Sequence, residues 1–177
     1  MTTARTEALW PRVPPKRLRE ELQHDDSDDL ARRRAVILLS LAGMAGMAAV
    51  TALQTGIIRH LPDPPGPFDS DKVNSSETAY RWGLPDGPIA LASLGLNVAL
   101  AALGEPDRAR KQPWIPLAAA VKAGVEAAAA SWYFYQMPAK EKAWCPYCIG
   151  GALANIGIAA ATVPEARRAW RELRRHR

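Results

Sequence analysis

The two cysteines of this chain are the only ones in its 177 residues, and they lie three positions apart in the run Trp144-Cys145-Pro146-Tyr147-Cys148. When such a motif opens a helix, the two sulfurs lie about one turn apart. The unpaired N–H groups and the positive end of the helix dipole then favour thiolate over thiol. A proline between the cysteines suits a helix start. The motif therefore predicts a redox-active dithiol, with Cys145 and Cys148 as catalytic residues.

Three other interpretations of the pair stay open at this point. Two cysteines in an apolar helix can be inert packing residues. A structural disulfide is a second alternative, although so short a loop gains little stability from chain entropy. A zinc site needs further Cys or His ligands, and only His60 of the three histidines is expected on the same membrane face. We therefore expect no metal.

Four apolar segments must position this motif, and they cover residues 35–58, 88–104, 113–137 and 144–163. The first carries no charged side chain and is long enough to cross a bilayer as a helix. A mean hydropathy of −0.18 hides this pattern because charge is concentrated in the tails and connections. We predict an all-α fold, an integral membrane four-helix bundle formed by residues 35–163.

Positive charges lie beside these segments: Arg32–Arg34 precede the first, and Arg108–Lys111 separate the second and third. The fourth is followed by arginines that include Arg167, Arg168, Arg171, Arg174 and Arg175. The positive-inside rule places these groups and both termini in the cytoplasm. The loop 59–87 and the two cysteines then lie on the outer face, where disulfides can form. Since topology accounts for the net charge of +5, we expect the lipid bilayer and no nucleic acid as a partner.

The two tails have different characters. Residues 1–34 combine prolines, a basic patch and four aspartates, which predicts a cytoplasmic tail that is disordered or held by a partner. Residues 164–177 predict a basic surface helix that begins at Pro164 and rests Trp170 and Leu173 on lipid headgroups.

Polar side chains inside the apolar segments are candidates for function. Lys122 and Glu126 share a helix face; they could deliver protons to a quinone, but a self-neutralising pair is the interpretation we favour. Asn97 and Asn155 either bridge helices or contact a quinone. The aromatic run 132–135 indicates an interfacial belt first and a quinone-stacking wall second.

A dithiol at the rim of a bilayer needs an electron acceptor, and a lipid-soluble quinone is the natural one. Cys148 lies one turn deeper in the bundle than Cys145. We therefore assign Cys148 to the quinone side and Cys145 to thiol–disulfide exchange with a partner, and the reverse order stays open.

The chain resembles the vitamin K epoxide reductase family. The resemblance rests on Cys145-Pro146-Tyr147-Cys148 at the outer start of the last helix, and on the loop Asp71-Lys72-Val73-Asn74-Ser75-Ser76 with the helix entry Gly83-Leu84-Pro85 and Pro88-Ile89-Ala90-Leu91. It covers roughly residues 35–163. It implies a four-helix bundle around a quinone, with electrons flowing from newly oxidised secreted proteins to that quinone. It also implies that the serine-containing stretch caps the quinone pocket, so Ser75 and Ser76 could hydrogen-bond a quinone carbonyl if the loop folds over the site. The alternative is that these serines are an ordinary loop cap for a short helix.

The chain departs from the family pattern in the outer loop. Most members carry a second cysteine pair there, which passes electrons from a thioredoxin-like partner to the Cys-x-x-Cys motif. Residues 59–87 contain no cysteine; Ser70 and Asp71 stand about where one would be expected, and Ser93 replaces a glycine usual in the second helix. The chain thus resembles a bacterial-type member without the loop cysteine pair.

Two functions follow from the sequence. The leading hypothesis is a membrane thiol–disulfide oxidoreductase of the bacterial inner membrane, with the pair on the periplasmic face, a thioredoxin-like periplasmic partner and ubiquinone or menaquinone as acceptor. The alternative is a non-catalytic relative, a structural or assembly subunit that binds other membrane subunits. An enzyme is the preferred hypothesis of the two.

Overall fold

A computed structural model describes residues 14–175, and within them every regular element is helical. The predicted all-α class is therefore confirmed. The elements are α1 (Pro15–His24), α2 (Asp28–Gln54), α3 (Ser70–Asn74), α4 (Asp86–Ala102), α5 (Arg108–Lys111), α6 (Trp114–Gln136), the π-helical turn η1 (Met137–Glu141) and α7 (Pro146–Arg175).

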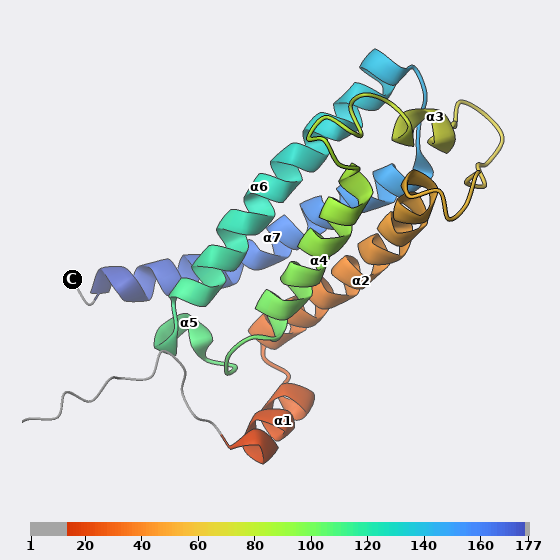
Figure 1. Cartoon of the computed structure of the whole chain (residues 1–177). Helices are drawn as coiled ribbons and strands as arrows, with labels where there is room; N and C mark the ends of the chain where they lie inside the picture. Colours follow the sequence, from red (N-terminus) through yellow and green to blue (C-terminus); the bar gives the residue numbers. More distant parts are fainter. Residues whose placement is uncertain (1–13, 176–177) are drawn as a thin grey trace, which may run out of the picture.

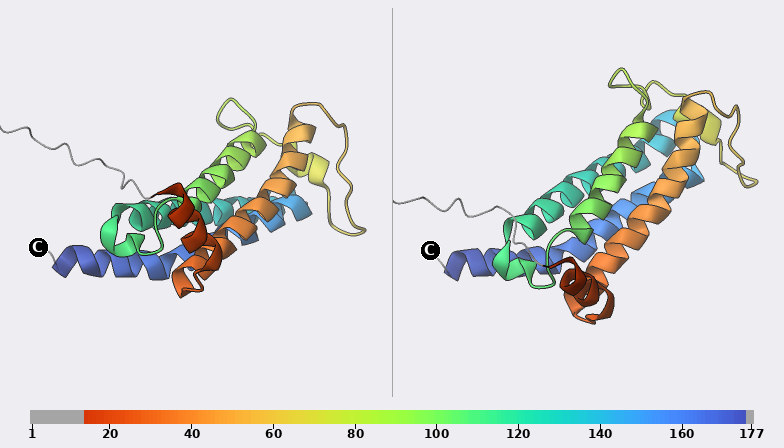
Figure 2. Two further views of the ribbon diagram at one scale, coloured as in Figure 1. Left: turned by 90° about the horizontal axis from the view of Figure 1, so that it is seen from below. Right: turned by 60° about the horizontal axis from the view of Figure 1, so that its bottom comes forward.

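The four long helices α2, α4, α6 and α7 lie side by side (Figure 1). Helix α2 packs against both α4 and α7, and α7 also packs against α6. Small residues permit the close approach: a Cβ on Gly43 of α2 would lie 3.1 Å from Leu94 of α4 and 3.3 Å from Ala154 of α7. The outer loop and α3 lie together over one end of these helices (Figure 2).

Two of the helices, α2 and α7, are long and apolar enough to cross a membrane, and α4 is a shorter apolar helix. The four-span arrangement and the side on which each terminus lies remain predictions.

Helix α2 begins seven residues before the predicted span. Ser27 caps it, because the Ser27 hydroxyl accepts a hydrogen bond from the N–H of Leu30, and Asp28 and Asp29 suit the positive end of the helix dipole. Within the predicted tail, residues 15–24 form α1, and Arg34 donates to the carbonyls of Leu22 and Asp25 at its end. Residues 1–13 of that tail lie outside the described residues.

Helix α7 continues through Pro164, where the sequence analysis predicted a new helix. A proline inside a helix removes one hydrogen-bond donor, a loss that membrane helices tolerate when neighbouring helices hold the chain. Packing holds α7 on both sides of the proline, since Ile158 before it and Ala169 after it are completely buried. Residues 176–177 of the predicted surface helix lie outside the described residues.

At the end of the helices opposite α3, Glu165 of α7 accepts hydrogen bonds from two arginines. Arg108 Nε and Nη2 lie 2.9 and 2.8 Å from its carboxylate oxygens, and Arg33 Nε lies 3.1 Å away. All three side chains are buried. The arginines also donate to carbonyls at the end of α4 and in the connection that follows it. Two residues that the sequence analysis used only as topology signals thus form a buried ion cluster.

Candidate functional site

A disulfide joins Cys145 and Cys148 at the start of α7. Cys145 directly precedes the helix and caps it: its sulfur accepts a hydrogen bond from the Cys148 N–H at 3.1 Å, and its carbonyl accepts one from Ile149 at 2.9 Å. The two sulfurs differ in access. Cys145 is completely buried, whereas Cys148 is half-buried and lines a cavity.

The outer loop covers Cys145. Trp144 pairs with this loop through two backbone hydrogen bonds, donating to the Pro67 carbonyl at 3.0 Å and accepting from the Asp69 N–H at 2.9 Å. The hydroxyl of Tyr147 donates to the Pro62 carbonyl at 2.9 Å. Bonds from Trp144, just before the motif, and from Tyr147, within it, therefore hold the loop over the disulfide.

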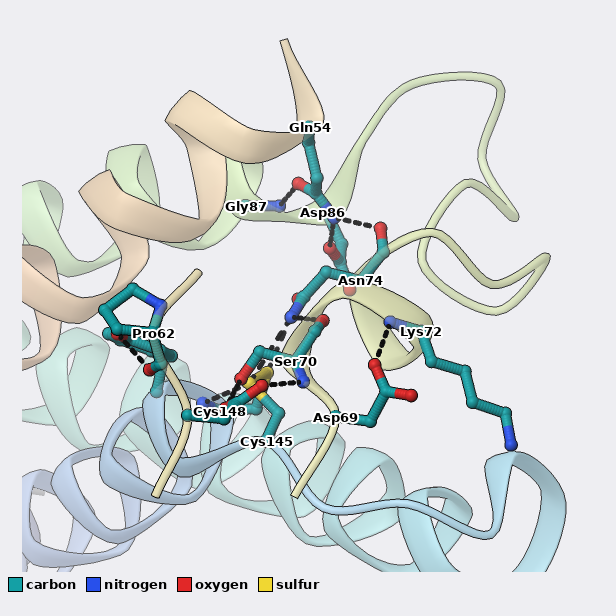
Figure 3. The surroundings of a disulfide bond; sticks show 12 residues. Gln54, Pro62, Asp69, Ser70, Lys72, Asn74, Asp86, Gly87, Cys145 and Cys148 are labelled. Atoms are coloured by element: carbon teal, nitrogen blue, oxygen red, sulfur yellow. Dashed lines mark hydrogen bonds between the residues drawn. A yellow bond between two sulfur atoms is a disulfide. The ribbon is translucent and has the colours of Figure 1, made fainter. Parts of the chain in front are cut away.

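Asn74, the last residue of α3, lies against both sulfurs (Figure 3). Its Nδ2 lies 3.3 Å from Cys145 Sγ, and its Oδ1 lies 3.4 Å from Cys148 Sγ. The same Nδ2 donates to the Ser70 carbonyl at 2.7 Å. The side chain is almost completely buried, so its amide is a fixed part of the surroundings of the disulfide.

Three polar side chains fix α3 in this position. Asp69 caps the helix by accepting from the Lys72 N–H, and Asp63 accepts from both the N–H and the hydroxyl of Ser70 at 2.7 and 2.6 Å. Gln54, at the end of α2, donates to the Asn74 carbonyl at 3.2 Å and so ties α3 to the helices below.

Asp71 anchors the preceding part of the loop to α3. Its carboxylate lies 2.8 Å from Nδ1 of His60 and accepts from the Leu61 N–H at 2.9 Å. Partial burial opposes ionisation of Asp71, but these two hydrogen bonds outweigh it, and the pKa of Asp71 lies below its ordinary value.

The cavity beside Cys148 has a volume of about 320 Å³, within the usual range for small-molecule sites. Most of its wall is apolar, from α2, α4, α6, η1 and α7. Two buried oxygen atoms in wall residues, Oγ of Ser76 and Oδ1 of Asn155, have no hydrogen-bond partner among the described residues. A buried polar atom without a partner is costly unless a ligand or water supplies one, so these atoms point to an occupant with polar groups.

Part of the wall also belongs to a polar cluster between α4 and α6. Lys122 of α6 is paired with Glu126, and both are hydrogen-bonded to Ser93 and Asn97 of α4. Glu126 and Ser93 line the cavity. The two side chains thus form an ion pair against α4, and the choice between a self-neutralising pair and a proton route to a quinone stays a prediction.

The predicted site residues separate into two groups. Cys145, Cys148, Ser76 and Asn155 are at the disulfide or the cavity. Ser75 is exposed at the end of α3, and Asn97 engages Lys122 and Glu126 through the two ends of its amide, so neither belongs to the cavity wall.

The contact of Asn74 with the two sulfurs was not predicted from the sequence, where this residue counted only as part of the loop that carries the family resemblance. A signal was present, since Asn74 is the only amide side chain in the loop 59–87 and follows Ser70 by one helical turn.

The model of the vitamin K epoxide reductase family matches residues 34–163. This match spans most of the chain and includes both cysteines, the outer loop and the cavity. Searches of curated proteins and of solved structures found no match.

Proposed function

The chain belongs to the vitamin K epoxide reductase family, and from that premise we propose that its Cys145–Cys148 pair passes electrons from a partner dithiol to a membrane quinone. The family implies a membrane thiol–disulfide oxidoreductase that works with a quinone and with thioredoxin-like partners.

One observation carries the proposal: Cys148 lies in the wall of an apolar cavity and is bonded to a cysteine that caps a helix. A purely structural disulfide does not need a cavity at one of its sulfurs. Cys148 lines the cavity and Cys145 does not, which supports contact of a bound quinone with Cys148.

The cavity residues fit a quinone head group. Its wall is mainly apolar, as a lipid-soluble ring requires, and the Ser76 hydroxyl can donate to a quinone carbonyl. Oδ1 of Asn155 can only accept, which suits a hydroxyl of the reduced form. When bound, the quinone supplies an acceptor for the two electrons and two protons that the dithiol releases on closing its disulfide.

Electrons enter from a partner, because the chain has only these two cysteines. A reduced thioredoxin-like protein exchanges directly with the Cys145–Cys148 disulfide through a mixed disulfide. We place the protein in a bacterial inner membrane with the pair at the periplasmic face, since such exchange needs an oxidising compartment. Ubiquinone and menaquinone are the candidate acceptors.

The test is quinone reduction by the purified full chain in lipid nanodiscs. With a reduced thioredoxin-like protein and short-chain ubiquinone or menaquinone, the wild type should reduce the quinone, and Cys148→Ser should not. Ser131→Ala is the matched control, because its hydroxyl is exposed on α6 and bonds only to the carbonyl of Ala127.

An absence of turnover with every partner and quinone would overturn the proposal. Together with copurification in a stoichiometric complex, it would support the alternative of a non-catalytic structural or assembly subunit.

A further inference from the structure

The wall of the cavity contains three carboxyl groups, and two of them have a cation nearby. Glu126 is paired with a lysine of its own helix. Glu141 accepts a hydrogen bond at 3.0 Å from the Thr78 hydroxyl, which accepts one at 3.1 Å from Lys140. The third carboxyl belongs to Asp86, which forms no ion pair with any described residue. In this part of the chain, Asp86 is thus the wall carboxyl without a cation among its contacts.

The contacts of the Asp86 carboxyl are with neutral groups. Gln54, at the end of α2, donates from Nε2 to Oδ1 at 2.7 Å, and the same nitrogen donates to the Asn74 carbonyl (Figure 3). Backbone N–H groups at the start of α4 also favour the charged form. Burial outweighs these bonds, so the pKa of Asp86, which precedes the predicted span 88–104, lies above its ordinary value. The carboxyl therefore keeps its proton to a higher pH than an exposed aspartate does.

Asp86 also lies between the cavity and the outer surface. It is the first residue of α4, its side chain is half-buried, and its N–H donates to the Ala79 carbonyl at 2.9 Å. Residues 80–84, in the turn that this bond closes, are all exposed, and so is the charged residue Glu77 before them. A proton on the carboxyl can therefore reach the cavity on one side and water on the other.

We propose that Asp86 is the acid through which the cavity exchanges protons with the outer surface. This role deepens the proposed function and rests on it. Closing the disulfide releases two electrons and two protons from the dithiol, and reduction of a quinone consumes two of each. Asp86 gives one proton to a quinone oxygen, and the dithiol gives the other. The second proton of the dithiol goes to water at the outer surface, from which Asp86 regains its own, so the carboxyl is unchanged at the end of the cycle.

The first test is a titration that needs neither quinone nor partner. NMR is recorded on the full chain in nanodiscs, with aspartate labelled with ¹³C at Cγ and the disulfide closed. The signal of Asp86 is the one that is missing in Asp86→Asn, and Asp86→Glu removes the same signal if Asp86→Asn does not fold. Its midpoint should lie at higher pH than those of the exposed aspartates. A midpoint among theirs would overturn the proposal.

The second test measures how pH affects quinone binding without electron transfer. With the disulfide closed, the pair has no electrons to give and Cys148 does not titrate. Because a quinone carbonyl binds the protonated acid better, the Kd of the wild type for short-chain ubiquinone should be constant below the Asp86 midpoint. Above it, the Kd should rise by about tenfold per pH unit, as the loss of one proton requires. Calorimetry in nanodiscs measures it. Asp86→Asn should remove this rise, and Asp86→Glu should keep it.

Glu77→Gln is the matched control, because it makes the same chemical change at an exposed carboxyl outside the cavity wall. The rise in Kd should remain in this variant. The other titratable groups of the wall stay present in Asp86→Asn; they belong to Glu126, Tyr133 and Glu141. An unchanged rise in Asp86→Asn would assign the pH dependence to one of these groups and overturn the proposal.

The outcomes separate this proposal from the proposed function. Binding that depends on pH through Asp86, without any quinone turnover, would refute electron transfer and leave Asp86 as the acid that exchanges protons with the cavity. Turnover with a Kd that does not change with pH would support the oxidoreductase and refute the role of Asp86.

Discussion

The two ends of the helices both bury polar groups, but these groups differ in whether they have partners within the protein. At the end with the ion cluster, the Glu165 carboxylate is paired with Arg33 and Arg108, and the arginines' remaining bonds go to backbone carbonyls. At the end with the disulfide, Ser76 Oγ and Asn155 Oδ1 have no hydrogen-bond partner among the described residues, and both residues line the cavity. Asp29 Oδ1, Arg32 Nη1 and Arg168 Nη2 near the ion cluster also lack hydrogen bonds among the described residues, but they form ion pairs with one another. Groups paired in this way indicate a structural role, whereas Ser76 Oγ and Asn155 Oδ1 have neither kind of partner there and belong to residues of the cavity wall.

Removing the carboxylate of the ion cluster should give the largest effect on stability. Glu165→Ala leaves two buried arginines without their counter-charge, and breaking a buried pair in this way typically costs about 3–5 kcal/mol. Thermal unfolding in nanodiscs measures the loss. Glu172→Ala is the control on the same helix, because its exposed pair with Arg175 contributes less than about 1 kcal/mol. Equal losses in the two variants would contradict a structural role for the cluster.

A change at the contact of α2 with α4, at the disulfide end of the helices, should couple stability to the site. Gly87 of α4 donates its N–H to Oε1 of Gln54, and a Cβ at Gly87 would lie 2.6 Å from that oxygen and 3.1 Å from Val50. Gly87→Ala therefore overpacks the contact of α2 with α4, at a cost of about 1–3 kcal/mol. Because Gln54 also donates to the Asn74 carbonyl, the variant should alter reduction of the disulfide as well as thermal stability.

Gly124→Ala on α6 is the matched control for this substitution. No atom of the described residues outside its own helix backbone lies within 4 Å of the added Cβ, and alanine favours the helix by about 0.5–1 kcal/mol. A loss of stability in Gly124→Ala equal to that in Gly87→Ala would mean that the helices tolerate no added methyl group at all.

A change at the cavity should weaken binding of the proposed quinone and leave the stability of the fold unchanged. Ser76→Ala removes the donor proposed for a quinone carbonyl and leaves no other group unsatisfied, because the Ser76 hydroxyl has no partner among the described residues. We expect the KM for quinone to rise several-fold, corresponding to about 0.5–1.5 kcal/mol, with the melting temperature unchanged. A lower melting temperature with an unchanged KM would assign Ser76 to the structure instead.

The sequence was sufficient for the parts of the molecule that depend on local pattern. The apolar segments identified the long helices α2, α4, α6 and α7, and the Cys-x-x-Cys spacing placed the disulfide at a helix start. Helix ends were less predictable, because the largely charged residues 28–34 that follow the Ser27 cap are helical without being apolar.

The sequence was insufficient wherever distant residues meet. Arg33 and Glu165 are 132 positions apart, and Asn74 is 71 positions from Cys145. Neither pairing produces a local pattern, because each depends on how whole helices pack. Ser75 and Ser76 are adjacent in the sequence, yet only Ser76 lines the cavity. The direction of the turn that ends α3 decides which of the two serines faces it, and this turn leaves no pattern in the sequence.

The smallest expected effect concerns the loop over Cys145, and it tests whether this cover limits access to the disulfide. The Asp71 carboxylate binds Nδ1 of His60 and the Leu61 N–H. Because this side chain is one-third exposed, these contacts contribute on the order of 1 kcal/mol or less to the stability of the loop. Since its pKa is below the ordinary 3.8, its contribution is complete above that pH and is lost as the pH falls through the lower, folded-state value. Asp71→Asn should therefore lower the protection of the His60 and Leu61 amides against hydrogen exchange near neutral pH, to the protection factors that the wild type reaches only in acid. If the loop is a true cover, the same variant should also speed reduction of the disulfide by a bulky protein dithiol more than by a small thiol. No acceleration of either reductant would mean that the disulfide is reached without the loop moving, so that the loop covers Cys145 without limiting access to Cys148.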